Sequence, residues 1–125
     1  MSKLGERMLM VAFSIQGNSS EKKGKELISK VMKQIEVNEA HKPITYYYPL
    51  AGKGGKGFTT IWPITESFIA FDAWPDHKGA YFIICSCRIF WVKDVISILK
   101  KLRYKILDTK INELSLVRDE LTTGC

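Results

Sequence analysis

The sequence predicts an α+β fold, a two-layer sandwich in which a mainly antiparallel β-sheet carries two helices packed on one face. Two segments have one apolar face at helical spacing, and four strand-like runs follow one another between them. Consecutive strands without an intervening helix favour antiparallel pairing and leave the second sheet face open. The 125 residues, 46% hydrophobic and 26% charged, fit a single domain over residues 1–125.

The first two elements are a strand at Met8–Ile15 and a helix from Glu21 to about Val37. Ser19 or Ser20 is expected to cap this helix, and Gly24 is expected to weaken its first turns slightly. The predicted buried face of the helix consists of Leu27, Ile28, Val31, Met32 and Ile35.

The rest of the chain alternates strand-like runs with turns before a second helix. Pro49 is expected to stop the second strand, and Pro63 to separate the third from the fourth. The predicted segments are a strand at Lys42–Leu50, a loop at Ala51–Gly57, strands at 58–64 and 66–74, a turn at Asp76–Gly79, a central strand at Ala80–Cys87, a helix at Val92–Arg103 and a strand at Tyr104–Leu114. The inward residues of the second helix are predicted to be Val95, Ile96, Ile98, Leu99 and Leu102. The residues after Ser115 receive no assignment.

Composition narrows the functional classes. No apolar run approaches a membrane span, and the N-terminal apolar run lacks a cleavage site, so we expect a cytoplasmic protein with free thiols and no membrane partner. The net charge of +6 comes from lysines spread over the helices and one loop. This pattern favours a solvated basic surface and makes nucleic acid an unlikely partner, with an anionic ligand or acidic partner as the alternative.

Three local patterns carry weak signals. "GKGGKG" in the 51–57 loop lacks the spacing of a phosphate-binding loop, so it is either a flexible loop or a lid over a nearby site. Cys85, Cys87 and His77 lack the paired spacing of a zinc site, so we predict no metal. The tyrosines at 46–48 are either packing residues or a stacking platform for a flat or cationic ligand.

The strongest signal is "PITESFIAFDAWPDHKGAYFIICSC", residues 63–87. The stretch resembles the prokaryotic S-adenosylmethionine decarboxylase family, whose members generate their own pyruvoyl cofactor. Glu66-Ser67 stands at the family's cleavage pair, Trp74-Pro75-Asp76 matches its Trp-Pro-Glu, and Cys87 falls at the family cysteine twenty residues after the serine. Upstream, Tyr47, Pro49 and Thr59 fill further family positions if the glycine-lysine loop is an insertion.

The resemblance implies a mechanism of self-cleavage followed by decarboxylation. Ser67 attacks the carbonyl of Glu66, Thr59 assists, and elimination leaves a pyruvoyl group derived from Ser67. The pyruvoyl forms a Schiff base with the substrate amine and accepts the electrons that decarboxylation releases. Cys87 returns a proton to the substrate, and Tyr47 and then Trp74 are the candidates to contact the sulfonium and adenine of S-adenosylmethionine. The family likeness also implies a homodimer and a role in polyamine (spermidine) synthesis.

Two positions depart from the family pattern. Phe68 replaces the histidine after the serine, and Asp72 replaces the histidine five residues on, which acts as the base in self-cleavage. A carboxylate serves as a base near neutral pH only when its surroundings are sufficiently buried, and residues five apart point to opposite sides of a regular strand. A bulge or a chain break would therefore be needed to bring Ser67 and Asp72 together.

These departures leave alternatives to the S-adenosylmethionine decarboxylase proenzyme. One is an unprocessed, non-catalytic family member that binds a ligand or regulates a partner. Another is a relative that decarboxylates arginine or ornithine, and a third is an unrelated basic binding module.

Overall fold

A computed structural model describes residues 6–48 and 57–117 of the chain. The elements are β1 (Arg7–Gln16), α1 (Glu21–Gln34), β2 (Ile44–Tyr47), β3 (Phe58–Ile64), β4 (Ser67–Trp74), a 3₁₀ turn (Pro75–His77), β5 (Gly79–Ser86), α2 (Val92–Lys101) and β6 (Lys105–Ser115). This order is the predicted one. Pro49, residues 51–56 of the predicted loop and the tail after residue 117 lie outside the described residues.

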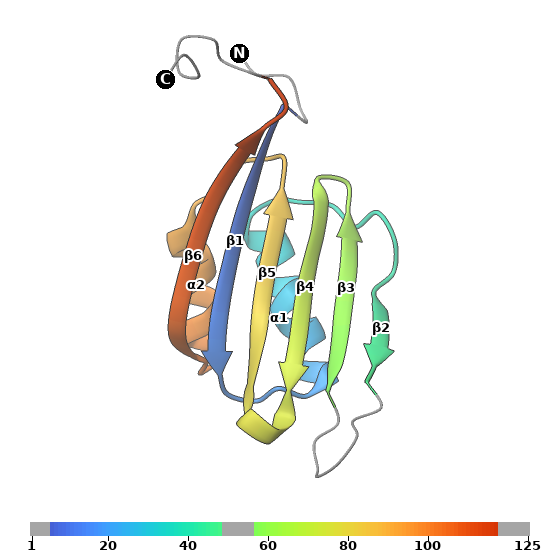
Figure 1. Cartoon of the computed structure of the whole chain (residues 1–125), viewed down its shortest axis with the longest axis vertical. Coiled ribbons are helices and arrows are strands. Elements are labelled where there is room, and N and C mark those ends of the chain that lie inside the picture. The colour runs from blue at the N-terminus through green and yellow to red at the C-terminus, as the bar shows by residue number, and fades with distance from the viewer. Residues whose placement is uncertain (1–5, 49–56, 118–125) are drawn as a thin grey trace.

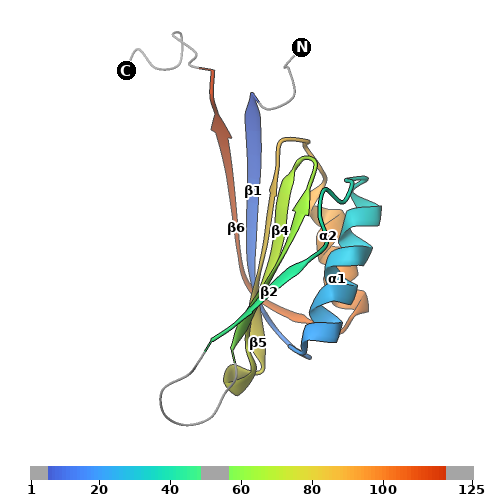
Figure 2. The same ribbon diagram turned by 90° about the vertical axis from the view of Figure 1, so that its right-hand side faces the viewer.

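The strands form one antiparallel sheet in the order β2-β3-β4-β5-β1-β6 (Figure 1). Both helices lie against the same face, and the other face carries no helix within the described residues (Figure 2). The predicted two-layer α+β architecture is therefore confirmed, including the central place of β5.

Helix α1 begins at its predicted residue because Ser20 caps it. The Ser20 hydroxyl accepts the amide of Lys23, which satisfies one of the free N–H groups of the first turn. The helix ends three residues earlier than predicted, at Gln34, because Glu36 turns into a left-handed conformation (φ 58°) and reverses the chain. The predicted apolar face is buried as expected.

Gly24 has a packing role that the sequence did not indicate. A Cβ at this position would lie 2.6 Å from Cδ2 of Phe71, whose ring is fully buried on β4. The glycine therefore lets α1 approach the sheet closely. The cost in helix propensity is offset by the contact that the missing side chain permits.

Two details of the strands differ from prediction. The second strand covers only Ile44–Tyr47, which is shorter than the expected 42–50. Pro63 does not separate two strands but lies inside β3, opposite Phe68 of β4. A proline is tolerated there because that end of β3 runs beyond β2, and its carbonyl accepts the amide of Ala40. The chain turns at residues 65–66 instead.

The core lies between the sheet and the helices. Its largest fully buried side chains are Phe13, Phe71, Phe82, Ile15, Leu27, Ile28, Ile69, Ile84, Leu99, Val11, Val31 and Val95. On α2, Val95, Ile98 and Leu99 are buried, whereas Ile96 and Leu102 are only partly so. Alternation along β4 then assigns its odd-numbered residues to the helix-facing side and its even-numbered residues to the open side.

Candidate functional site

A two-residue turn, Thr65–Glu66, places the predicted cleavage bond at the start of β4. Ile64 pairs with Ser67 across this turn, so the Glu66–Ser67 peptide lies at the end of the hairpin. Ser67 has φ 151°, a value that favours glycine and is strained for a residue with a side chain. The strained torsion is therefore the one that directly follows the peptide bond that the sequence singled out. Ser67 itself is half-buried.

The carbonyl of Glu66 has a hydrogen-bond donor aimed at it. The amide of Cys87 donates to the Glu66 oxygen at 2.9 Å. Glu66 is 8% exposed, and its side chain is fixed because Oε1 accepts the amide of Asn38 at 3.2 Å and the Thr65 hydroxyl at 2.7 Å. The peptide before Ser67 is thus held from the β5 side and from the segment that follows α1.

The residues that follow β5 form the other wall of this region. Ser86 lies opposite Ser67 in the sheet and is fully buried; its hydroxyl donates to the carbonyl of Arg88 at 2.7 Å and accepts the amide of Arg88 at 2.9 Å. The Arg88 guanidinium donates to the carbonyl of Glu36 beyond α1. Cys87 is half-buried between these residues. The chain around Cys87 is therefore fixed at the same end of the sheet as Ser67.

Thr59 and Asp72 form a second cluster. Thr59 of β3 pairs with Asp72 of β4 in the register set by the turn at residues 65–66. The Thr59 hydroxyl donates to Oδ1 of Asp72 at 3.1 Å. Asp72 lies five residues beyond Ser67, which corresponds to about 16 Å along a strand. Asp72 is on the open side of β4, whereas Ser67 has the parity of the helix-facing residues. Within one chain the structure does not bring them together.

Two aromatic residues lie beside the second cluster. The rings of Tyr48 and Trp74 stack with centroids 5.8 Å apart and planes 19° from parallel, and the Tyr48 hydroxyl also bonds that of Thr59. Trp74 borders a hollow of about 410 Å³ on the open face, shared with Ser14, Tyr81 and Leu107 among others. Its Nε1 is buried and has no hydrogen-bond acceptor among the described residues. An indole N–H without an acceptor therefore lies buried beside this hollow.

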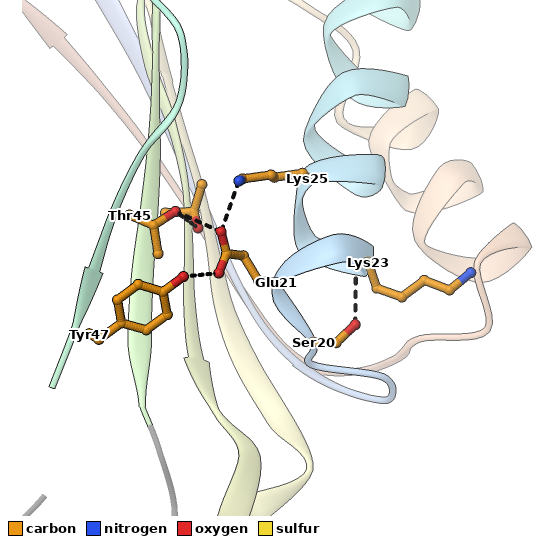
Figure 3. Close-up of polar contacts among 7 residues, drawn as sticks. Ser20, Glu21, Lys23, Lys25, Thr45 and Tyr47 are labelled. Carbon is orange, nitrogen blue, oxygen red and sulfur yellow. Dashed lines mark hydrogen bonds and ion pairs between the residues drawn. The ribbon is translucent and has the colours of Figure 1, made fainter. Parts of the chain in front are cut away.

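Tyr47, the other aromatic candidate, points to the helix side of the sheet edge (Figure 3). Its hydroxyl donates to the carboxylate of Glu21, which also accepts Nζ of Lys25 at 2.8 Å and the hydroxyl of Thr45 at 3.4 Å. The bonds from Lys25 and Tyr47 hold the pKa of Glu21 below its usual value, and the carboxylate raises the pKa of Tyr47. This network joins β2 to the first turn of α1.

The sequence thus named residues at both clusters but not their arrangement. Glu66, Ser67 and Cys87 are brought together at one end of the sheet, and Thr59, Asp72 and Trp74 lie towards the other end. Sequence reasoning named Tyr48 only as one of three adjacent tyrosines, and it missed the Cys87 amide and the buried hydroxyl of Ser86. Strand parity could have singled out Tyr48 from Tyr47, because Tyr48 falls on the same side as Tyr46 and opposite to Tyr47.

The described residues also bear on the cysteines, metal binding and membrane insertion. Cys85 and Cys87 carry free thiols, and burial raises the pKa of the Cys85 thiol. Among residues 6–48 and 57–117, no three histidine, cysteine or acidic side chains are grouped as a metal site would need. In the same residues no helix has the length and apolar character needed to cross a membrane.

The fold has a solved counterpart. A crystal structure described as the adenosylmethionine decarboxylase from Aquifex aeolicus VF5 superposes with a TM-score of 0.62. The match covers 93% of this chain and 98% of that one, at 16% sequence identity, so it shows a shared fold. No sequence model of a protein family matches the chain, and no curated protein matches it by sequence.

Proposed function

We propose that the chain is a self-cleaving proenzyme that splits between Glu66 and Ser67 and becomes a pyruvoyl-dependent decarboxylase of S-adenosylmethionine, with a role in polyamine (spermidine) synthesis. The observation that carries the proposal is the backbone at this bond. The φ of Ser67 is 151°, and the preceding carbonyl already accepts the amide of Cys87. The shared fold with an adenosylmethionine decarboxylase supports the same conclusion.

The first step is an attack by the Ser67 hydroxyl on the Glu66 carbonyl carbon. The C–N bond breaks as the C–O bond forms, so the peptide becomes an ester and the nitrogen of Ser67 becomes an amine. Negative charge develops on the Glu66 oxygen during this shift, where the Cys87 amide is in place to stabilise it. Release of the strained φ supplies further driving force.

The second step needs a base to remove the α-proton of residue 67, with Glu66 leaving as a carboxylate. The imine that results at residue 67 then loses ammonia to water. The residues present fit a pyruvoyl group at this position, because Ser67 is half-buried rather than sealed in the core. When formed, the group supplies a carbonyl that accepts the electrons released with CO₂. We assign the return of a proton to Cys87.

The separation of Ser67 from Asp72 leads us to propose a homodimer. If two copies met through their open sheet faces in opposite directions, the Ser67 end of one would lie near the Thr59–Asp72 cluster of the other, and the Ser67 hydroxyl would reach Asp72 only by turning from the helix-facing side to the open side at this first residue of β4. Apolar side chains on that face include Ile44 and Phe68, which are 39% and 36% exposed. Each site would then combine Ser67 and Cys87 from one copy with Asp72 from its partner.

The substrate contacts that we propose lie on the same face. The hollow beside Trp74 offers an aromatic surface for a sulfonium or an adenine. Tyr48, stacked on Trp74, takes part in this surface. Tyr47, which points to the helix side and donates its hydroxyl to Glu21, stays a candidate contact outside this face.

Denaturing mass spectrometry of the purified chain tests the cleavage. The expected products are residues 1–66 and residues 67–125, the second lighter than its sequence mass by one ammonia. Ser67→Ala is the control and should stay intact. A wild-type chain that stays whole after prolonged incubation, with or without hydroxylamine, would remove the proposal, because hydroxylamine cleaves an ester intermediate even where the base is missing.

A mixing experiment tests the shared site separately. Ser67→Ala lacks the nucleophile, and Asp72→Ala lacks the proposed base, so neither should process alone. Refolded together, they should form mixed dimers in which the Asp72→Ala chain alone is cleaved. In addition, Asp72→His should process faster than the wild type. Mixed chains that never cleave, beside a wild type that does, would show that the base acts within one chain or is another group.

A second candidate function is a ligand-binding protein that is never processed. It is favoured by one observation, the hollow beside Trp74, which is present in the uncleaved chain. Calorimetry of Ser67→Ala with S-adenosylmethionine, and with Trp74→Phe as control, measures this binding directly. Binding by a wild-type chain that stays uncleaved would support this function over the enzyme.

A further inference from the structure

Strand β6 is the outer strand of the sheet and is unusually long. It spans Lys105–Ser115 and pairs with β1 along one side, so its other edge faces away from the sheet (Figure 1). Most strands have five or six residues, and exposed edges of this length are sites where other strands add. Within the described residues nothing covers this edge.

The strand also exposes apolar side chains. Leu107, Ile111 and Leu114 are 52%, 55% and 57% exposed. Beyond the end of β5, β1 and β6 continue as a two-stranded ribbon, because Arg7 and Met8 pair with β6 but not with β5 (Figure 2). A long edge with exposed apolar residues is characteristic of an interface rather than of a surface in water.

The sequence of β6 is complementary to itself when read in the opposite direction. If two copies pair antiparallel with Thr109 opposite its own copy, Asp108 faces Lys110 of the second copy, and the same contact repeats on the other side of the axis. Asp108, Thr109 and Lys110 pair in unbroken register with β1, so this central stretch is regular. Two opposite-charge pairs therefore form around one axis.

The neighbouring registers are unfavourable. A two-fold axis at Asp108 puts two carboxylates opposite each other, and an axis at Lys110 does the same with two ammonium groups. Strand β6 has a bulge at Leu107, because Ser14 of β1 pairs with Asp108 and the next residue, Ile15, pairs with Ile106. If Leu107 is also left out of the β6–β6 pairing, Ile106 of one copy falls opposite Ile111 of the other. Both isoleucines lie opposite core residues of β1, so this register also pairs two apolar residues.

We propose that β6 pairs edge to edge with β6 of a second copy of this chain, antiparallel and centred on Thr109, so that two six-stranded sheets become continuous. The contact uses a different surface from the open face and does not require the proposed activity. Within one chain, Nζ of Lys110 and Oδ2 of Asp108 are 3.8 Å apart and highly exposed, so this weak pair leaves both charges available to a partner.

Charge exchange tests the register. Asp108→Lys places like charges opposite each other in a pair of identical chains, and so does Lys110→Asp. Sedimentation equilibrium of either variant alone should show the edge contact weakened about tenfold or more. An equimolar mixture should associate as tightly as the wild type, because every facing pair is again opposite in charge. The intrachain pair is absent from both variants, so recovery in the mixture reports the contact between chains.

Cross-linking tests the axis. Thr109→Cys should give a disulfide-linked dimer under mild oxidation, because the two-fold places this residue opposite itself, whereas Asn112→Cys should not. The wild type under the same oxidant controls for native cysteines, and Phe68→Lys on the open face should leave the cross-link unchanged. A mixture of the charge variants that associates no better than either alone, or cross-linking equal at both positions, overturns the proposal whether or not the chain self-cleaves.

Discussion

The strained backbone at Ser67 predicts that glycine at this position is more stabilising than alanine, which is the opposite of the usual order in a strand. In an ordinary strand, glycine is less stable than alanine by about 0.5–1 kcal/mol, because glycine loses more conformational freedom on folding. A residue with a side chain at φ 151° carries a strain of about 1–3 kcal/mol that glycine avoids. With values near the middle of both ranges, Ser67→Gly should be more stable than Ser67→Ala by about 1–2 kcal/mol.

Neither variant has a hydroxyl at position 67, so both remain uncleaved chains and the comparison is free of processing. Urea unfolding followed by circular dichroism should place the midpoint of the glycine variant about 0.5–1 M higher, for a slope of about 2 kcal/mol per M. Ala70, in the middle of β4, supplies the control, because Ala70→Gly should lower stability in the usual way. An alanine variant as stable as the glycine variant would refute the strain and with it the main support for self-cleavage.

Three further predictions concern other parts of the molecule. Gly24→Ala should lower the free energy of unfolding by about 1–3 kcal/mol despite the better helix propensity of alanine, because the new methyl group meets the Phe71 ring. Urea unfolding measures this difference, and a variant more stable than the wild type would contradict the packing argument. Glu21→Gln should destabilise the chain above pH 4.5 but not in stronger acid. Hydrogen bonds from Lys25 and Tyr47 lower the pKa of Glu21 in the folded chain. Their contribution to stability is therefore present above the pKa of the unfolded chain and is lost as the pH falls through the pKa of the folded chain. Curves of stability against pH that stay parallel for the wild type and the variant would contradict this prediction. Cys87 should react with iodoacetamide well before Cys85, because Cys85 is 4% exposed and burial raises the pKa of its thiol; peptide mass mapping would expose the reverse order.

The fold was predictable because its signals are local. Helical spacing from Leu27 to Ile35 identified the buried face of α1, and the strand-like runs gave the element order. The role of Gly24 could not be predicted from the sequence, because it lets α1 pack closely against Phe71, which is 47 residues away in sequence. The end of α1 was misjudged for a similar reason: Ile35 and Val37 are buried, but they continue the core beyond a left-handed residue rather than the helix.

The site was only half predictable, because register depends on where a hairpin turns. The sequence predicted that β3 and β4 are separated at Pro63, whereas the chain turns at Thr65–Glu66. Once that turn is placed, the pairing of Ile64 with Ser67 fixes every other pair of β3 and β4, including Thr59 with Asp72. Motif spacing along the chain gave the residues, but the turn decides which of them face each other.

The choice between a self-cleaving enzyme and an unprocessed binding protein depends on why a serine occupies position 67. Glycine at position 67 would make the chain more stable, because it avoids the strain of the positive φ. A protein that only binds a ligand has no use for the Ser67 hydroxyl, so nothing in its function would favour serine over glycine there. The strain at Ser67 is reinforced by its surroundings, since the Glu66 carbonyl and carboxylate are both held by main-chain amides. A hydroxyl kept at a strained bond, next to a carbonyl that already has a donor, is what an acyl shift requires. This arrangement favours the enzyme, and it locates the weak point of the mechanism at Asp72 rather than at the nucleophile.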